Sequence, residues 1–205
     1  MSERSLRVMF QIINRLSMNI REKIVKSAVG LFIQQGVDKT TTKQIATQAS
    51  VAEGSIYRYF RSKDELAWQV FKHYHQYLAY QLQASAEQEL NLKQKINSLV
   101  GCFLKMADED WLMFRYYLTS QHTYIERVSK DMLTPFQVLT SVVEHGIEAG
   151  DIKVADKNVL TAMLMGAVHQ IAINKIYSRI SGELYVHCEQ VTNTLINMLE
   201  GGCDE

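Results

Sequence analysis

The chain has 205 residues, of which 47% are apolar, with one proline, ten glycines and three cysteines. So few prolines and glycines exclude an all-β protein rich in tight turns and favour helices. Three widely spaced cysteines argue against a disulfide framework and indicate a reduced, cytoplasmic protein, and no uncharged apolar run reaches the roughly eighteen residues of a membrane span. The net charge is zero, but residues 1–65 carry eleven Lys/Arg against six Asp/Glu. This balance weakly favours a nucleic-acid-binding head; the alternative is a chance excess on a solvated surface.

The first seventeen residues combine arginines with short apolar stretches. The pattern is similar to a signal peptide, but the apolar run is interrupted and no small-residue cleavage site follows it. Two interpretations remain open. Residues 1–17 form a basic arm that extends the first helix or contacts DNA, or translation begins at Met18.

Two helices are expected next. From residue 20 to 35, one apolar stripe recurs at helical spacing: Ile20, Ile24, Ala28, Leu31 and Phe32. Gly36 then ends the first helix as a C-terminal cap. Thr41 with Gln44 forms a capping box, which predicts a second, short helix from Thr41 to about residue 50. This helix directs Ile45 and Ala49 inward.

A third and a fourth helix follow a turn at residues 51–53. The third is expected from Gly54 to about Phe60. A second capping box, at residues 62–65, opens a long fourth helix from Lys63 to about Gln83. Two capping boxes that flank a helix, a turn and a helix make a helix-turn-helix assignment specific.

The third helix has the geometry of a DNA-recognition helix. Ile56 and Phe60 share one face and anchor the helix in the core, whereas Gly54 and Arg58 lie opposite, with Ser55 nearby. Glycine allows close approach to DNA, and arginine can donate a bidentate pair to guanine O6 and N7. The groups placed to bind phosphates are Tyr57, Tyr59, Lys63 and the free amides near Thr41. The alternative is an ordinary three-helix subdomain with a tyrosine-rich surface.

The segment from Ile20 to Leu66 resembles the DNA-binding signature of TetR (tetracycline repressor)-type bacterial regulators. The most specific part is the ending Tyr57-x-Tyr59-Phe60-x-x-Lys63-x-x-Leu66. The resemblance implies a homodimer that places its third helices in the two halves of a palindromic operator. Members commonly begin a few residues before such a segment, which favours Met18 as the start. By motif position, the implied DNA contacts are Thr41, Thr42, Gly54, Ser55, Tyr57, Tyr59 and Lys63.

Three residues depart from the family pattern. Ser50 stands where glycine is frequent, and we expect slight strain there because a non-glycine residue at positive φ is unfavourable. Ala52 replaces a hydroxyl residue that would cap the third helix. Glu53 stands where a basic residue is frequent; it repels phosphate, and either accepts a hydrogen bond from cytosine N4 or favours the helix N-terminus.

Beyond Leu66 the resemblance fades to architecture. Helices are expected at about 90–107, 109–122, 126–148, 156–179 and 183–200, and Pro135 either kinks the third of these or marks its internal start. The last two are apolar and contain small residues that allow close packing. They form an internal core or, by family analogy, a four-helix interface with a second copy.

Aromatic residues and methionine are most frequent between the head and the last two helices. Such a stripe is more often plain core, but in this family the region lines an effector cavity, so we expect a mostly apolar, aromatic-lined pocket. The candidate lining residues are Phe103, Met106, Phe114, Tyr117 and His169. Trp111 with a nearby acid such as Asp108 suits an organic cation, although the acid is as readily a solvated surface group.

The sequence therefore predicts an all-α protein of about nine helices: an extension at 1–17, a helix-turn-helix domain at 18–65 and an effector-binding and dimerisation domain at 66–205. We expect a cytoplasmic regulator that is not an enzyme, needs no cofactor or metal and does not contact membranes. Its DNA contacts include Glu53 and Arg58, and a small molecule releases it from DNA. The alternatives are a chromosome-organising or division protein of the same fold and a helical small-molecule-binding protein. His73 and His75 cannot share a metal, because residues two apart on a helix point in opposite directions.

Overall fold

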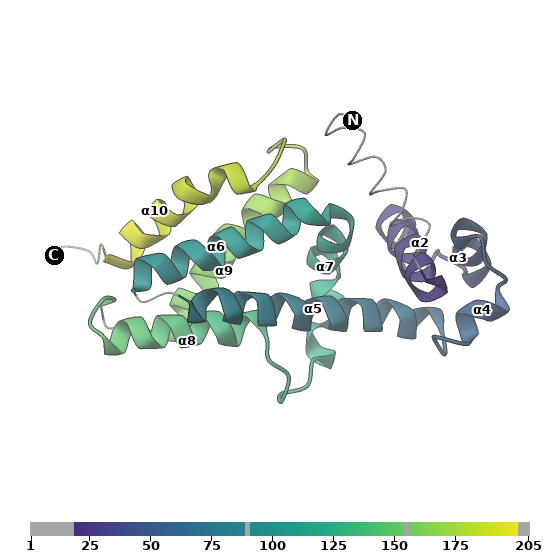
Figure 1. The fold of residues 1–205 in the computed structure, drawn as a ribbon, viewed down its shortest axis with the longest axis horizontal. Helices are drawn as coiled ribbons and strands as arrows, with labels where there is room; N and C mark the ends of the chain where they lie inside the picture. Colours follow the sequence, from purple (N-terminus) through teal and green to yellow (C-terminus); the bar gives the residue numbers. More distant parts are fainter. Residues whose placement is uncertain (1–18, 89–90, 154–155, 201–205) are drawn as a thin grey trace, which may run out of the picture. The chain divides into compact units, whose positions relative to one another are not determined.

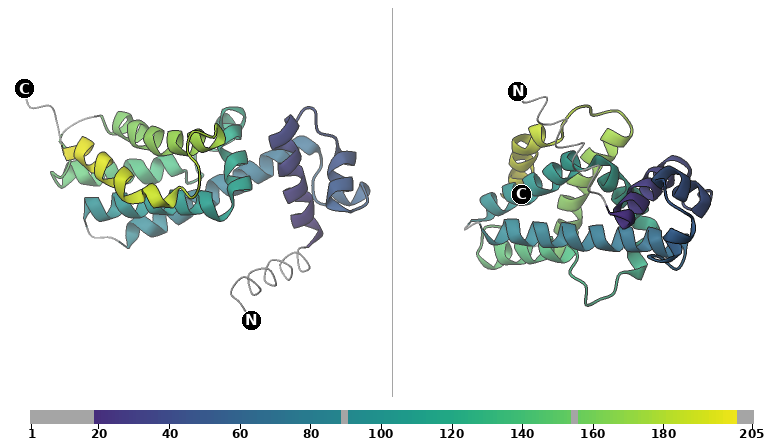
Figure 2. Two further views of the ribbon diagram at one scale, coloured as in Figure 1. Left: turned by 90° about the horizontal axis from the view of Figure 1, so that it is seen from above. Right: turned by 45° about the vertical axis from the view of Figure 1, so that its right-hand side comes forward.

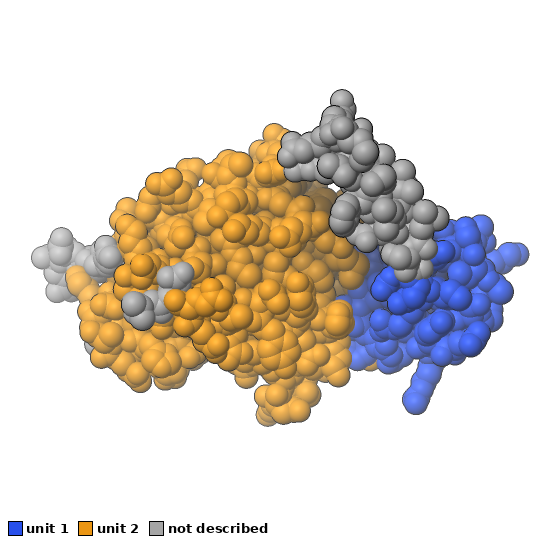
Figure 3. All heavy atoms as spheres, viewed as in Figure 1, with its two compact units in different colours: residues 1–70 blue, residues 71–205 orange. Residues whose placement is uncertain are grey.

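The computed structural model describes residues 19–88, 91–153 and 156–200, which form nine α-helices, two short 3-10 helices and no strand (Figure 1). This confirms the all-α class. The chain divides into two compact units at residues 70 and 71 (Figure 3), which we call the head and the body. The division falls inside helix α5, Lys63–Glu87. The predicted boundary between residues 65 and 66 stays a prediction, and the extension at 1–17 lies outside the described residues.

The head contains α2 (Ile20–Gln35), α3 (Thr42–Ala49), α4 (Gly54–Tyr57) and the first turns of α5. Helix α2 ends as predicted at Gly36, whose φ of 82° is one that glycine adopts without a Cβ clash. Helix α4 is shorter than the expected Gly54–Phe60 and ends at Tyr57. A helix of four residues has almost no stability of its own, so the head core must hold α4 in place.

Most of the predicted apolar stripe of α2 lies in the head core. Ile20 is the exception, because 44% of its surface is exposed. The inward direction of the second and third helices is confirmed, since Ile45 and Ile56 are fully buried and Phe60 is 1% exposed. The other core residues of the head are Ile24, Ala28, Val29, Leu31, Phe32, Ala46, Ala49, Leu66, Ala67 and Val70.

The body contains the rest of α5 together with α6 (Leu92–Glu109), α7 (Trp111–Tyr124), α8 (Pro135–Glu148), α9 (Lys157–Ile176) and α10 (Cys188–Glu200). Short 3-10 helices lie at Ile125–Arg127 and Tyr185–His187. Helix α10 packs against α6, and α8 packs against α9 (Figure 2). The first of these pairs brings together helices that are distant in sequence.

Two expected helices begin later than predicted. The helix expected at 126–148 begins at Pro135, and the helix expected at 183–200 begins at Cys188. Proline lacks an N–H and its ring collides with the preceding turn, so it fits the first position of a helix and not the interior. Of the two outcomes expected for Pro135, the structure shows a helix start, capped by Thr134 in a full capping box with Gln137.

Candidate functional site

A tight turn between α3 and α4 sets the direction of the candidate recognition helix. Ser50 caps α3 in the left-handed conformation, with φ 55° and ψ 46°. The Val51 N–H donates to the Ala46 carbonyl at 3.0 Å and closes the turn. The strain expected at Ser50 is thus present, because a Cβ is unfavourable at this φ. Helix α4 has no side-chain N-cap, as the alanine at position 52 predicts.

Helix α4 and the residues after it present a polar surface over buried anchors. Tyr57 and Tyr59 are 55% and 40% exposed, although tyrosine is usually half-buried or more. Gly54 faces open space, because a Cβ built there meets no atom within 4 Å. Arg58 is exposed and Ser55 is half-buried. These residues lie outside the head core, on a surface that a partner can reach.

The remaining candidate contacts lie at the start of α3 and of α5. The Thr41 hydroxyl accepts from the Gln44 amide at 3.2 Å, and the Gln44 side chain accepts from the Thr41 amide at 2.8 Å, which is the predicted capping box. Lys63 donates to the Asp38 carbonyl at 3.1 Å. At the start of α5 the second capping box is half formed, since the Glu65 amide donates to the Ser62 hydroxyl, but the Glu65 carboxylate accepts from Gln69 at 2.8 Å.

Glu53 also belongs to this surface, and it is hydrogen-bonded to two other candidates. Its carboxylate accepts from the Thr42 hydroxyl at 2.6 Å. The Thr42 oxygen lies 3.3 Å from the Tyr57 hydroxyl. All nine DNA-contact candidates thus come from the start of α3, the α4 segment and the first turn of α5. Their contact with DNA stays a prediction.

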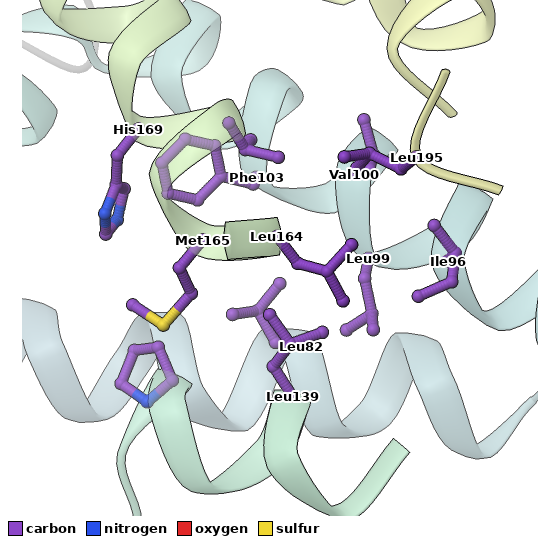
Figure 4. Close-up of a pocket in the computed structure, with 12 residues that line it drawn as sticks. Leu82, Ile96, Leu99, Val100, Phe103, Leu139, Leu164, Met165, His169 and Leu195 are labelled. Carbon is purple, nitrogen blue, oxygen red and sulfur yellow. The ribbon is translucent and has the colours of Figure 1, made fainter. Parts of the chain in front are cut away.

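The body contains a small, partly open apolar cavity of about 50 Å³, whose lining residues Figure 4 shows. Two of the five predicted lining residues, Phe103 and His169, lie on its wall, with ring centroids 5.1 Å apart. His169 is the one polar lining side chain, and burial lowers its pKa to about 4, so the imidazole is neutral near pH 7. The other lining residues are Leu82, Ile96, Leu99, Val100, Pro135, Leu139, Leu164, Met165, Val168 and Leu195.

Met106, Phe114 and Tyr117 do not line this cavity. Phe114 is fully buried and meets the Phe103 ring edge-to-face at 4.9 Å, so it lies behind the wall. Met106 is 7% exposed and lies 4.0 Å from the Cys102 sulfur. Aromatic residues in α7 therefore mostly fill the core of the body, which was the alternative interpretation of the aromatic stripe.

Tyr117 belongs to an aromatic cluster with α5. Its ring lies 5.6 Å from Phe71 and 5.4 Å from Tyr74, and its hydroxyl lies 3.3 Å from Nδ1 of His75. His75 is 3% exposed, and its Nε2 has no hydrogen-bond partner among the described residues. Burial lowers the pKa of His75 to about 4. The cluster keeps a neutral imidazole inside the body, because burial disfavours the charged form.

The suggested cation site at Trp111 is occupied by an internal cation. The Lys175 ammonium lies 4.8 Å from the Trp111 ring centroid and donates to the Asp108 carboxylate at 3.0 Å. Asp108 also accepts from the amides of Leu184 and Tyr185 at 2.9 and 2.8 Å. Burial raises the pKa of Asp108, but these hydrogen bonds and Lys175 outweigh it, so the pKa lies below its usual value. Asp108 is therefore a structural link between α6 and the α9–α10 connection.

Sequence reasoning missed most of the cavity wall. Leu139, Leu164 and Met165 line it from α8 and α9. Their apolar, helically spaced pattern is the same for a residue that faces a closed core and for one that faces a cavity. Only the packing of α6 against α9 distinguishes the two, and the sequence does not show which helices meet.

The comparisons with known proteins agree with this description. The family model "Bacterial regulatory proteins, tetR family" matches residues 24–70. The "Fatty acid metabolism regulator protein" of Bacillus subtilis is 20% identical over 185 residues, 88% of this chain and 93% of that protein. The fatty acid degradation regulator FadR of Bacillus halodurans has a similar structure, with a TM-score of 0.75 and 20% identity over 92% of this chain and 98% of that chain.

A second similar structure is that of FadR from Bacillus subtilis in complex with stearoyl-CoA. Its TM-score is 0.67, with 19% identity over 85% of this chain and 96% of that chain. At these identities, the two structural likenesses show the fold alone, over most of the chain. The family match covers the segment that carries all nine DNA-contact candidates.

Proposed function

We propose that this chain, which belongs to the TetR family of bacterial regulatory proteins, is a homodimeric repressor released from a palindromic operator by a mostly apolar small molecule. The chain is a DNA-binding transcriptional regulator by its family; the dimer, the palindrome, the ligand class and a cytoplasmic location are our proposal. The main observation behind this proposal is the surface of the head. Tyr57, Arg58 and Tyr59 are exposed there, while the neighbouring Ile56 and Phe60 are buried and hold the segment in place.

The exposed face of α9 supports a dimer. By length and composition alone, α9 could cross a membrane, but only 22% of its apolar window is buried within the chain. Val159 and Met163 are 57% and 49% exposed, and Ala162, Gly166 and Ala167 on the same helix are exposed as well. An exposed apolar face of this size marks an interaction surface, and small residues allow a second helix to approach closely. A second copy of α9 and α10 fits this face, and two-fold pairing supplies the two recognition helices that a palindrome needs.

The cavity supports an apolar ligand. Eleven of its twelve lining residues are apolar, and the twelfth is a neutral histidine. Such a wall favours an acyl chain over a carboxylate or a cation, because an unpaired charge in an apolar cavity is costly. A relative of the same fold holds stearoyl-CoA, so we propose the acyl chain of an acyl-CoA as the ligand class for this chain.

The proposed mechanism couples the cavity to the head through α5. This helix supplies Leu82 to the cavity wall and Leu66 to the head core. A ligand that displaces the cavity end of α5 changes the arrangement of the recognition helices in the dimer. Coupling of about 1–3 kcal/mol would change DNA affinity by about 5–150-fold.

Genomic footprinting tests the function most directly. We expect one or a few palindromic sites, including one at the protein's own promoter, and release from that duplex in the presence of a long-chain acyl-CoA. Many dispersed sites would instead support a chromosome-organising role. Sedimentation of the purified chain tests the dimer, and partition into vesicles without dimer formation would contradict the interface on α9.

A further inference from the structure

Three exposed groups of the head form a hydrogen-bonded chain across the α3–α4 turn. The Thr42 hydroxyl donates to the Glu53 carboxylate at 2.6 Å, and the Tyr57 hydroxyl lies 3.3 Å from the Thr42 oxygen. The residues lie 11 and 15 positions apart in the sequence, so the turn brings them together. All three lie among the DNA-contact candidates.

The protons that the hydrogen-bonded groups can donate are few enough to count. A hydroxyl carries one proton, and a carboxylate only accepts. The Thr42 proton points to Glu53, because a hydrogen bond to a charged acceptor is the stronger one. Tyr57 must then donate its own proton to the Thr42 oxygen. Both protons are therefore used inside the head.

A DNA phosphate competes for the same two protons. Phosphate oxygens only accept, so a hydroxyl binds them by donating its proton. Thr42 and Tyr57 can each make a phosphate contact only after their internal bonds are broken. Glu53 also brings a negative charge to this surface, and this charge opposes the approach of the backbone.

We propose that Glu53 is an internal competitor of the DNA backbone. In the free head it holds the hydroxyls of Thr42 and Tyr57 as donors, and DNA binding exchanges these bonds for phosphate contacts. Glu53 thereby keeps the affinity for arbitrary DNA low, a property that a repressor needs when nonspecific sites far outnumber its operator. This inference rests on the proposal that Thr42 and Tyr57 contact DNA.

The test measures binding of the full-length protein to a random-sequence DNA duplex by fluorescence anisotropy at fixed low salt. Glu53→Ala removes both the charge and the acceptor, whereas Glu53→Gln removes the charge and keeps an acceptor oxygen. Asp38→Asn is the matched charge control, because Asp38 is an exposed acid of the head and accepts from Lys63 through its backbone carbonyl, which the substitution keeps. Thr42→Val and Tyr57→Phe remove the hydroxyls in the wild-type and in the Glu53→Ala background.

We expect Glu53→Ala to bind the duplex about fivefold tighter than wild type, and Glu53→Gln and Asp38→Asn about twofold tighter. Removal of either hydroxyl should weaken binding less than about twofold in the wild type and about fivefold in the Glu53→Ala background, because the freed hydroxyls then contribute fully. Thermal melting by circular dichroism should show that the head stays folded in each variant.

Two outcomes overturn the inference, and they differ. If the hydroxyl losses are equal in both backgrounds, Glu53 acts through its charge alone and the hydrogen-bonded chain has no effect on binding. If neither hydroxyl matters in either background while the protein still binds the duplex, Thr42 and Tyr57 are not DNA contacts and the proposed interface is misplaced.

Discussion

The head and the body carry their candidate sites in opposite ways. In the head, functional side chains such as Tyr57 are exposed and their positions are set by a turn and a few buried anchors. In the body, the candidate cavity is lined by side chains from five helices, and most of them are also part of the core. A surface site requires certain residues in a certain order, whereas an internal cavity requires only enough apolar volume in the right places.

This difference explains why the two regions differ in how easily their roles are found. The head has a sequence signature because Gly36, Thr41 and Lys63 each do a local job that few other residues can do. The body wall accepts many combinations of leucine, valine and methionine. Substitutions should therefore separate the two regions, and the predictions below do so from the largest effect to the smallest.

Phe60→Ala should have the largest effect. Phe60 is 1% exposed and anchors the segment that follows α4, so its loss should cost about 3–5 kcal/mol of head stability and abolish DNA binding. Tyr59→Ala is the control, because Tyr59 is 40% exposed and should affect DNA binding with little change in stability. The measurement is urea unfolding followed by the fluorescence of Trp68, the head tryptophan, in a Trp111→Phe background. A Phe60→Ala head as stable as wild type would contradict the anchor role.

Acidification should weaken the body and spare the head. All six histidines lie in the body, and burial lowers the pKa of His75 and of His169 to about 4. Between pH 6.5 and 4 the unfolded state binds protons that the folded body does not, so stability is full above about pH 6.5 and falls as the pH is lowered. For His75 alone we expect a loss of about 1–2 kcal/mol from pH 7 to pH 5.

The pH effect is measured by urea unfolding followed by the fluorescence of Trp111, the body tryptophan, in a Trp68→Phe background. His75→Phe should remove the contribution of His75 to the slope of the unfolding free energy against pH, because the unfolded chain then gains no proton at this position. A slope that is unchanged in this variant would show that His75 takes up a proton in the folded state, for instance on its Nε2.

A larger side chain in the cavity should block the ligand and leave DNA binding intact. Val168 lines the cavity and is 8% exposed, so Val168→Phe should lower the affinity for a long-chain acyl-CoA about tenfold, equivalent to about 1.4 kcal/mol. Val186→Phe is the control, because it adds the same ring at a body position that is 69% exposed. It should change neither the affinity for the acyl-CoA nor the affinity for DNA. Equal ligand binding by both variants would place the ligand outside this cavity.

The smallest effect is expected at the two left-handed serines, one in each unit. Ser50 and Ser178 have φ values of 55° and 57°. Glycine has no Cβ penalty at this φ but loses more freedom on folding, so Ser50→Gly should stabilise the head and Ser178→Gly the body by about 0.5–1 kcal/mol. The two tryptophan probes assign each gain to its unit. A loss of stability at either position would mean that its serine makes a compensating contact.

The sequence predicted the head closely because its signals are local. The capping box at Thr41, the stop at Gly36 and the anchors Ile56 and Phe60 all depend on neighbours within a few residues. The same local signal existed in the body, where Thr134, Pro135 and Gln137 begin α8. Apolar residues before Thr134 continue a helical pattern without forming a helix, and this moved the expected start to residue 126.

The cavity could not be predicted at the same level. Aromatic content pointed to Phe114 and Tyr117, which instead fill the core beside Phe103 and Phe71. The wall residues Leu164 and Leu195 come from helices whose pairing depends on contacts between residues far apart in the chain. Such pairing depends on the packing of the whole body, so a short stretch of sequence does not predict it.

The size of the cavity sets how the regulator would respond to dose. A space of about 50 Å³ holds one or two water molecules, which is far less than a long acyl chain occupies. A ligand of that class therefore needs a state in which the helices around the cavity have moved apart. Its apparent affinity is the intrinsic one reduced by the population of that open state. The concentration at which the switch operates would then be tuned by how firmly α6, α8 and α9 pack together, and substitutions that never touch the ligand could move that threshold.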